Sequence, residues 1–319
     1  MKKISIISNL KILLIFLLLN SEKPEEIFWI FDDKIEIRNK TIKSFKVERN
    51  KGLFDLVKKS IKYYFYFKIL SIKYNLKNLI VYGCDHIIGA KFFLKRNKFI
   101  LLEDGTQNYE KNTYKRSLKN RLFSIPVFGV YKNVEKIYLT GLAPIPEEIK
   151  DKVEIINLKE LWNKKSKVEK EEILSIFGFN NEIINNLKGK NKILYTQPLS
   201  EDGVISEEEK IELYRQIIKN YDEKELIIKK HPREKTDYKT IFDKVEVLNQ
   251  SFPAELFDLL DIKFKKAITI FSTAALLDKE IEIDFYGTEI HPKLVKKFGR
   301  IDNIIKSNKK ISEIFEGDK

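Results

Sequence analysis

Residues 3–31, KISIISNLKILLIFLLLNSEKPEEIFWIF, contain two β-rich runs with an apolar helical stretch between them. We expect a strand at Lys3–Ile7, a buried helix at Lys11–Leu19 and a second strand at Ile27–Phe31. This order is that of a βαβ unit, the element that opens a parallel sheet.

The same segment has a second interpretation, as a signal peptide or a membrane anchor, because lysines precede its apolar run. However, Ser8, Asn9 and Lys11 interrupt the run, which is shorter than the roughly 20 apolar residues needed to span a bilayer. No small-residue cleavage site follows it. We therefore favour the buried helix, and contact of residues 4–19 with a membrane surface stays open.

The composition indicates a globular protein with two domains. The chain has 319 residues, 43% of them hydrophobic and 34% charged, so each domain can bury a core. The net charge of +13 favours an anionic partner. The sequence has no arginine-rich tail of the kind that binds nucleic acid, so we expect no nucleic-acid partner. The one cysteine excludes an intrachain disulfide. With three widely spaced histidines, we expect no protein-built metal site.

Strands and helices alternate in two sets. Further strands of the first set are expected at 79–82, 99–102, 134–139 and 153–156, with an aromatic-rich helix at 53–74 whose rings face the core. Strands of the second set are expected at Lys192–Tyr195, Glu225–Ile228, Val245–Leu248, Lys266–Ile270 and Ile281–Phe285, with helices at 207–220 and 254–260.

We therefore predict an α/β protein of two Rossmann-like lobes that face a central cleft. Residues 1–157 form the first lobe and residues 191–319 the second. A charged helical connector at 158–190 joins them.

The motif Lys229-Lys230-His231-Pro232-Arg233 directly follows a predicted strand. Because a residue before proline prefers extended backbone, His231 should end that strand rather than start a helix. Ligands of open α/β sheets bind at the carboxyl ends of strands, so His231 is well placed to meet a phosphate. The alternative is a solvated basic turn.

Two pairs of carboxylates also follow predicted strands. Glu103-Asp104-Gly105 follows residues 99–102, and Glu201-Asp202 lies in the loop Gln197–Gly203 after residues 192–195. Either pair offers a base that accepts a proton from a hydroxyl. The alternatives are a plain Asp-Gly turn and a solvated loop ahead of a Ser206/Glu209 capping box.

Two further motifs suit a nucleotide. Ser272 and Thr273 follow a strand and open a predicted helix, where hydroxyls and free backbone N–H groups bind anions. Glu255 lies in the first turn of another helix, from which a carboxylate can accept ribose hydroxyls. Each motif by itself is also explained as an ordinary helix start.

Taken together, the acidic-acidic-Gly, His-Pro and Ser-Thr motifs resemble, in order and spacing, those of the bacterial sialyltransferases of glycosyltransferase family 52, which include lipooligosaccharide sialyltransferases. The resemblance implies a GT-B fold whose C-terminal lobe binds CMP-sialic acid. It implies inverting transfer of sialic acid to a sugar hydroxyl, with galactose expected, and no essential metal or other cofactor.

The resemblance also implies residue roles. His231 protonates or hydrogen-bonds the departing CMP phosphate, Ser272 and Thr273 hold that phosphate, and Glu255 binds the ribose. The base is Asp202 or Glu201 by analogy with family 52, or Asp104 by analogy with related families, and we favour Asp202. The loops that carry these groups add three further residues to the expected substrate-binding set: Pro232, Gln197 and Gly105.

Two alternatives stay open. One keeps the fold but makes a polysialyl chain or uses another CMP-activated acidic sugar. The other is a non-catalytic basic protein that binds anionic glycans or nucleic acid, with affinity that falls steeply with salt. For the enzyme we expect a bacterial cytoplasmic location, with peripheral contact at the inner face of the cytoplasmic membrane, where anionic lipids attract lysines. A homodimer is a further expectation.

Overall fold

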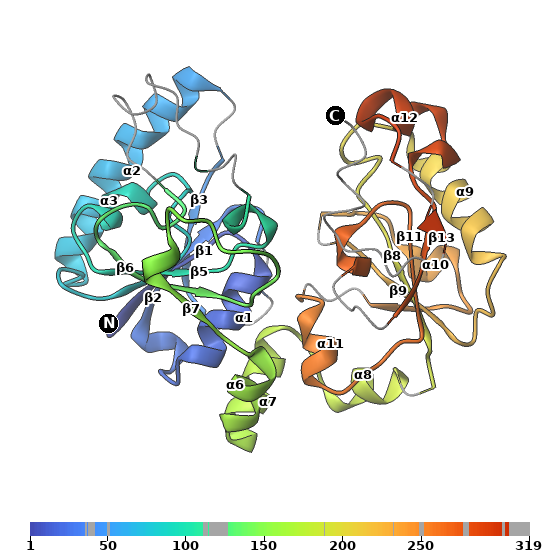
Figure 1. Cartoon of the computed structure of the whole chain (residues 1–319), viewed down its shortest axis with the longest axis horizontal. Helices are drawn as coiled ribbons and strands as arrows, with labels where there is room; N and C mark the ends of the chain where they lie inside the picture. Colours follow the sequence, from blue (N-terminus) through green and yellow to red (C-terminus); the bar gives the residue numbers. More distant parts are fainter. Residues whose placement is uncertain are drawn as a thin grey trace. The chain divides into compact units, whose positions relative to one another are not determined.

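The computed structural model describes residues 1–35, 37, 42–49, 52–110, 114, 127–187, 189–231, 233–248, 252–276, 281–301 and 304–305. The chain divides into two compact units, Met1–Phe177 and Gly178–Lys319 (Figure 1). Each unit is an α/β body with its own sheet.

The first unit contains a seven-stranded sheet in the order β3-β2-β1-β4-β5-β6-β7, and every strand pair is parallel. The strands are β1 (Lys3–Ile7), β2 (Ile27–Asp32), β3 (Ser44–Val47), β4 (Val81–Gly83), β5 (Phe99–Leu102), β6 (Val134–Leu139) and β7 (Val153–Ile155). The α-helices are α1 (Leu10–Leu19), α2 (Leu53–Lys73), α3 (Ala90–Leu94), α6 (Leu158–Lys164) and α7 (Lys167–Ile176).

Helix α1 is buried, which confirms the predicted βαβ unit. The side chain of Asn9 caps the helix by accepting a 2.9 Å hydrogen bond from the N–H of Ile12. Every residue from Ile12 to Leu18 is buried, so this segment belongs to the core of the first unit. Within the part of the chain that the structure describes, no helix is both long enough and apolar enough to cross a membrane.

Helix α2 has one buried face and one exposed face. Tyr63 and Phe67 are buried, and the ring of Phe67 packs edge-on against Phe93 of α3. Phe54 and Phe65 instead lie exposed on the opposite face. The prediction that the aromatic side chains of residues 53–74 face the core is therefore wrong for that second face.

The second unit contains a six-stranded sheet in the order β10-β9-β8-β11-β12-β13, parallel except for the β12–β13 pair. The strands are β8 (Lys192–Tyr195), β9 (Leu226–Lys229), β10 (Glu246–Leu248), β11 (Lys266–Thr269), β12 (Glu282–Phe285) and β13 (Ile304–Ile305). The α-helices are α8 (Asn181–Asn186), α9 (Glu207–Ile218), α10 (Tyr238–Ile241), α11 (Glu255–Leu259) and α12 (Pro292–Phe298).

The observed elements match the predicted alternation with small shifts at their ends. The strand expected at 225–228 begins one residue later, and the edge strands β3 and β13 were not predicted. The predicted connector at 158–190 is shared: α6 and α7 belong to the first unit and α8 to the second. The predicted capping box forms at the start of α9, where Ser206 and Glu209 satisfy each other's backbone N–H.

Each sheet has one point at which the strand order reverses direction. In the first unit this point lies between β1 and β4, and in the second it lies between β8 and β11. Ligands of open α/β sheets bind outside the carboxyl ends of the strands at such a point. The loops that leave these four strands are therefore the places where the chemistry is expected.

Candidate functional sites in the two units

The first unit has a cavity of about 790 Å³ next to its reversal point. The loops after β1, β4 and β5 contribute Ser8, Asn9, His86 and Asp104 to its wall. On another side, α2 contributes Leu56, Ser60 and Tyr64. A cavity of this size can accept a sugar or a short oligosaccharide.

Asp104 is held in one orientation at this cavity. Its Oδ1 accepts a 2.8 Å hydrogen bond from the Ser8 hydroxyl and another from the Asn9 side-chain amide, which also caps α1. Its backbone N–H donates to Asn108 at 2.6 Å. Burial raises the pKa of Asp104 above its ordinary value, and the electrostatic effect of the nearby His86 opposes that rise. A fixed carboxylate of raised pKa suits a general base.

His86 is the functional candidate that sequence reasoning missed. Its Nε2 lies 3.2 Å from Oδ2 of Asp104, and its ring stacks on Phe128 with centroids 5.0 Å apart and planes 10° apart. The contact joins the loops after β4 and β5. His86 does not precede a proline, as the other two histidines do, and no local pattern marked it.

Glu103, the neighbour of Asp104, has a structural role. It is fully buried and pairs with Lys11 at 2.5 Å. It also accepts hydrogen bonds from the Tyr109 hydroxyl at 2.6 Å and from Thr140. Gly105 follows in the left-handed region with φ of 111°, which requires glycine at this turn. The side chain of Glu103 therefore lies in the core, whereas that of Asp104 lies at the cavity.

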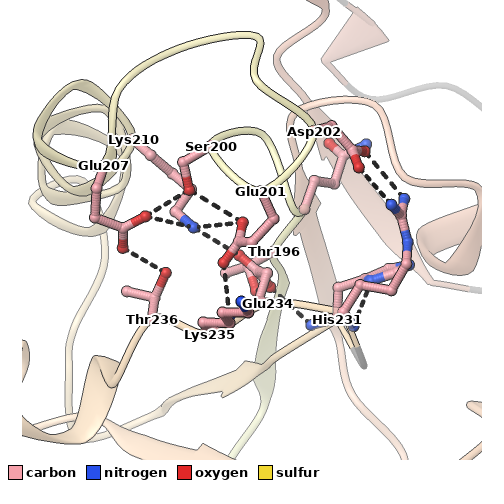
Figure 2. A network of polar contacts seen from close by, with 12 residues as sticks. Thr196, Ser200, Glu201, Asp202, Glu207, Lys210, His231, Glu234, Lys235 and Thr236 are labelled. Carbon is pink, nitrogen blue, oxygen red and sulfur yellow. Dashed lines mark hydrogen bonds and ion pairs between the residues drawn. The ribbon is translucent and has the colours of Figure 1, made fainter. Parts of the chain in front are cut away.

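The second unit holds a network of ionic groups after β8 (Figure 2). The ammonium of Lys210 is fully buried, 2.9 Å from Glu201 and 3.1 Å from Glu207. The N–H of Lys235 donates to Glu201 at 2.6 Å. Burial by itself raises the pKa of Glu201, but the bonds from Lys210 and Lys235 outweigh it and lower that pKa to about 2. Glu201 is therefore a poor proton acceptor.

Asp202 points the other way and pairs with Arg233 of the His-Pro-Arg motif (Figure 2). Both guanidinium nitrogens contact the carboxylate, one of them at 3.0 Å, which is the bidentate geometry that arginine prefers. Side-chain exposure is 37% for Asp202 and 39% for Arg233, so solvent reaches the pair. Of the two carboxylates in this loop, only Asp202 is accessible.

His231 is fixed at the end of β9 by its own neighbours. Its backbone N–H donates to Glu234 at 2.8 Å, and its Nδ1 accepts a 3.1 Å hydrogen bond from the N–H of Arg233. The ring proton of the neutral form is therefore on Nε2. Burial, with Arg233 and Lys229 nearby, lowers the pKa of His231 to about 4. In the unliganded protein the ring is therefore a neutral N–H donor near pH 7, which favours hydrogen bonding over protonation as the role of His231.

The loops at the reversal point of the second unit are tied together by Gln197. Its Oε1 accepts a 3.1 Å hydrogen bond from the N–H of Phe271, which links the loop after β8 to the loop after β11. The N–H of Ser272 donates to Thr269 at 2.9 Å, and the Ser272 hydroxyl accepts from the N–H of Ala274 at 3.3 Å. The predicted Ser-Thr loop is therefore a compact turn at a strand end.

The helix expected after Ser272 appears as a single 3-10 turn, Thr273–Leu276. Its continuation at 277–280 and the side chain of Thr273 lie outside the described residues, as does Pro232.

Glu255 begins the five-residue helix α11, as predicted, and its charge acts on a buried lysine. The ammonium of Lys229 donates to the carbonyl of Phe252 at 3.1 Å and lies 4.0 Å from the centre of that ring. Burial lowers the pKa of Lys229 to about 8, and Glu255 opposes this shift. Lys229 thus anchors the segment that leads into α11.

The comparisons with known proteins first establish the architecture. A Photobacterium phosphoreum α/β-galactoside α-2,3-sialyltransferase is similar in fold, with a TM-score of 0.57 and 14% identity over 92% of this chain and 94% of that one. A Photobacterium damselae sialyltransferase fragment that corresponds to the GT-B domain matches with a TM-score of 0.52 and 12% identity, over 92% and 95% of the two chains. The two sheets therefore form a GT-B type fold.

The sequence comparisons then give the family. The model of glycosyltransferase family 52 matches residues 24–294, which include strands of both sheets. The chain belongs to this family, so it is a glycosyltransferase. An uncharacterised protein of Haemophilus influenzae is 50% identical over 305 residues, which are 95% of this chain and 99% of that protein.

Proposed function

We propose that this glycosyltransferase moves sialic acid from CMP-sialic acid to a sugar hydroxyl, with galactose as the expected sugar, on a bacterial surface glycan such as lipooligosaccharide. The observation that carries the proposal is that Asp104, a carboxylate whose pKa is raised, lines an open cavity in the first unit. The other unit supplies the neutral donor His231 and the hydroxyl of Ser272 at strand ends. The solved Photobacterium 2,6-sialyltransferase in complex with CMP and lactose, with a TM-score of 0.56, supports a reaction of this class on this fold.

In the proposed reaction, the acceptor oxygen forms a bond to the anomeric carbon of sialic acid while the bond to the CMP phosphate breaks. The hydroxyl proton goes to Asp104, and the anomeric configuration inverts. Three carboxylates were expected from the sequence as possible bases. Of these, Glu201 already accepts hydrogen bonds from the Lys210 ammonium and from the N–H of Lys235. The carboxylate of Asp202 accepts hydrogen bonds from the guanidinium of Arg233. We therefore place Asp104 first as the base and keep Asp202 as the alternative.

The leaving phosphate carries its charge away from the sugar and needs no proton at neutral pH. We propose that Nε2–H of His231 donates a hydrogen bond to it, because charge-assisted donors stabilise charge that develops in the transition state. Ser272 donates its hydroxyl to the same phosphate, Thr273 assists, and Glu255 accepts ribose hydroxyls. No metal ion is assigned a role.

Calorimetric titration with CMP tests the donor site of the second unit directly. We expect saturable binding to wild type in the presence of a chelator, weakened about tenfold or more in Ser272→Ala, since a hydrogen bond to a charged group contributes about 1.5–3 kcal/mol. Ser206→Ala, which removes a helix cap instead, is the matched control and should keep wild-type affinity. Absence of CMP binding to a folded protein would contradict the proposal.

A polysialyltransferase, or a transferase of another CMP-activated acidic sugar, is the alternative that shares this site. We also propose that the enzyme works in the cytoplasm at the inner membrane face, because its CMP-sugar donor is cytoplasmic and its acceptor is linked to a lipid.

A further inference from the structure

The loop after β4 carries a buried carboxylate, Asp85, that the proposed reaction does not use. Asp85 is fully buried. Its Oδ1 accepts a 2.8 Å hydrogen bond from the N–H of Phe128, and its Oδ2 accepts a 2.9 Å hydrogen bond from the N–H of Gly129. Burial raises the pKa of Asp85, and these two N–H groups oppose the rise. A carboxylate offers an acceptor oxygen to each N–H, whereas an amide side chain of the same shape satisfies only one.

The two N–H groups belong to a tight turn, residues 127–130. Its central residues, Phe128 and Gly129, have positive φ of 56° and 88°, and the N–H of Val130 donates to the carbonyl of Val127 at 3.5 Å. These are the features of a type I′ turn, whose central positions are dominated by Gly, Asn and Asp. Left-handed backbone is strained for phenylalanine, and such strain persists only where the surrounding structure holds it in place.

The turn is held on both its donor and its acceptor groups. Asp85 binds two of its N–H groups. The ammonium of Lys152, just before β7, donates to the carbonyls of Gly129 and Tyr131, each at 2.9 Å. A Cβ on Gly129 would lie 2.3 Å from the side chain of Ile137 in β6, so the backbone of the turn packs directly on the sheet. Charged groups of opposite sign therefore fix this turn against the first unit.

The strained residue of the turn is the one that stacks on His86. The ring planes of Phe128 and His86 are 10° apart and their centroids 5.0 Å apart. On the same imidazole, Nε2 lies 3.2 Å from Oδ2 of Asp104. A flat ring packed on the imidazole restricts rotation of the imidazole about its bond to Cβ. The direction of Nε2 toward Asp104 therefore depends on where the turn holds Phe128.

We propose that Asp85 is a positioning residue for the contact between His86 and Asp104. Its carboxylate fixes the turn 127–130, and the turn holds the ring of Phe128 against His86. The stacked imidazole then keeps Nε2 directed at Asp104. The effect of Asp85 on transfer rests on the proposed function, whereas its effect on the orientation of His86 does not.

Proton NMR of the histidine side chains tests the orientation of His86, because the ring current of Phe128 displaces the resonances of an imidazole stacked on it. The chain has three histidines, and His86→Asn identifies the signals of this one. At a pH above the titration of the ring, Asp85→Ala and Phe128→Leu should move these signals in the same direction. Asp85→Asn, which leaves one N–H of the turn without an acceptor, should move them in that direction by less. It keeps the test open if Asp85→Ala does not fold.

Asn97→Ala is the matched control. The buried Asn97 amide also bonds two backbone groups of the first unit, the carbonyls of Leu76 and Leu79, at 3.0 and 2.9 Å. Its loss should lower the thermal midpoint of unfolding, as Asp85→Ala does, without moving the His86 signals. If Asn97→Ala moves them as far as Asp85→Ala, general loosening of the unit explains the shift and the proposal is wrong. It is also wrong if the signals stay in place in the Asp85 variants.

Transfer kinetics with CMP-sialic acid and lactose test the consequence for the reaction. Asp85→Ala should lower kcat by about 10–10²-fold, the scale of a misplaced catalytic group, and leave CMP affinity within about twofold of wild type. In the His86→Asn background the same substitution should cost about twofold at most, because Asp85 acts through His86. Equal losses in both backgrounds would overturn the positioning role. If folded wild type transfers no sialic acid, the proposed function fails, while the NMR signals still decide whether Asp85 orients His86.

Discussion

Nε2 of His86 lies 3.2 Å from Oδ2 of Asp104, and the two residues come from loops after adjacent strands of the first sheet. Ser8 and Asn9 hold the other carboxylate oxygen, so the position of Asp104 is set from both sides. Two strands and a helix start thus converge on one carboxylate at a cavity. This arrangement is the structural basis for proposing Asp104 as the base.

Replacing Asp104 by Asn should lower kcat by about 10²–10⁴-fold, because it removes the proton acceptor. The amide has nearly the same shape, so CMP affinity should stay within twofold of wild type, and calorimetry checks this. Asp202→Asn serves as the comparison. If it lowers kcat more than Asp104→Asn does, Asp202 is the base.

His86→Asn should shift the pH dependence of kcat/KM. Asp104 acts as a base only when ionised, so activity falls as the pH drops through its pKa. Burial raises that pKa and the electrostatic effect of His86 opposes the rise, so removing His86 should raise the pKa further. We therefore expect the acid limb to move to higher pH. An unchanged acid limb would show that His86 does not act through Asp104.

The imidazole of His231 should titrate with a midpoint near pH 4 in the free protein. Its proton NMR signals, assigned by comparison with His231→Asn, measure this midpoint. Bound CMP places negative charge beside the ring, so the midpoint should rise when CMP is added. A free-protein midpoint in the ordinary histidine range, about 6.5, would contradict the neutral-donor assignment.

Glu201 should contribute stability that acid removes. Its folded pKa of about 2 is below the unfolded value of about 4.3, so its contribution is present above that unfolded value and is lost as the pH falls toward 2. Glu201→Gln should therefore lower the free energy of unfolding by about 2 kcal/mol at pH 7 and by progressively less in acid.

Urea denaturation at several pH values measures this difference, with the exposed Glu171→Gln as the matched control. If the difference in free energy of unfolding between wild type and Glu201→Gln stays constant from neutral to acid pH, the carboxylate charge of Glu201 contributes nothing to stability.

Local patterns were sufficient to predict the sheets and the strand-end loops. Alternating β-rich and helical segments indicate two parallel α/β units, and apolar residues 12–18 indicate a buried helix. Motifs placed directly after strands lie at the carboxyl edge of each sheet because parallel strands bring their carboxyl ends to one edge. Strand β3 was missed because Ser44–Val47 is short, half polar and only partly buried.

Long-range contacts were beyond sequence reasoning. Lys210 gave no local signal that it would pair with Glu201, and this pairing lowers the pKa of Glu201 and makes it a poor proton acceptor. His86 likewise acquires its role only through a neighbour 18 positions away. The rings of residues 53–74 were expected to face the core, but Phe65 and Phe67 lie on different faces of α2 and only Phe67 is buried.

Transfer from CMP-sialic acid to lactose, followed as CMP release and sialylated product in the presence of a chelator, is the most direct test of the proposed function. We expect wild type to form one product of inverted anomeric configuration, and we expect Asp104→Asn to form almost none while still binding CMP. Absence of transfer by folded wild-type protein that is tested with lactose and with lipooligosaccharide would contradict the proposed sialyltransferase activity. Full activity of Asp104→Asn would contradict the role of Asp104 as the base.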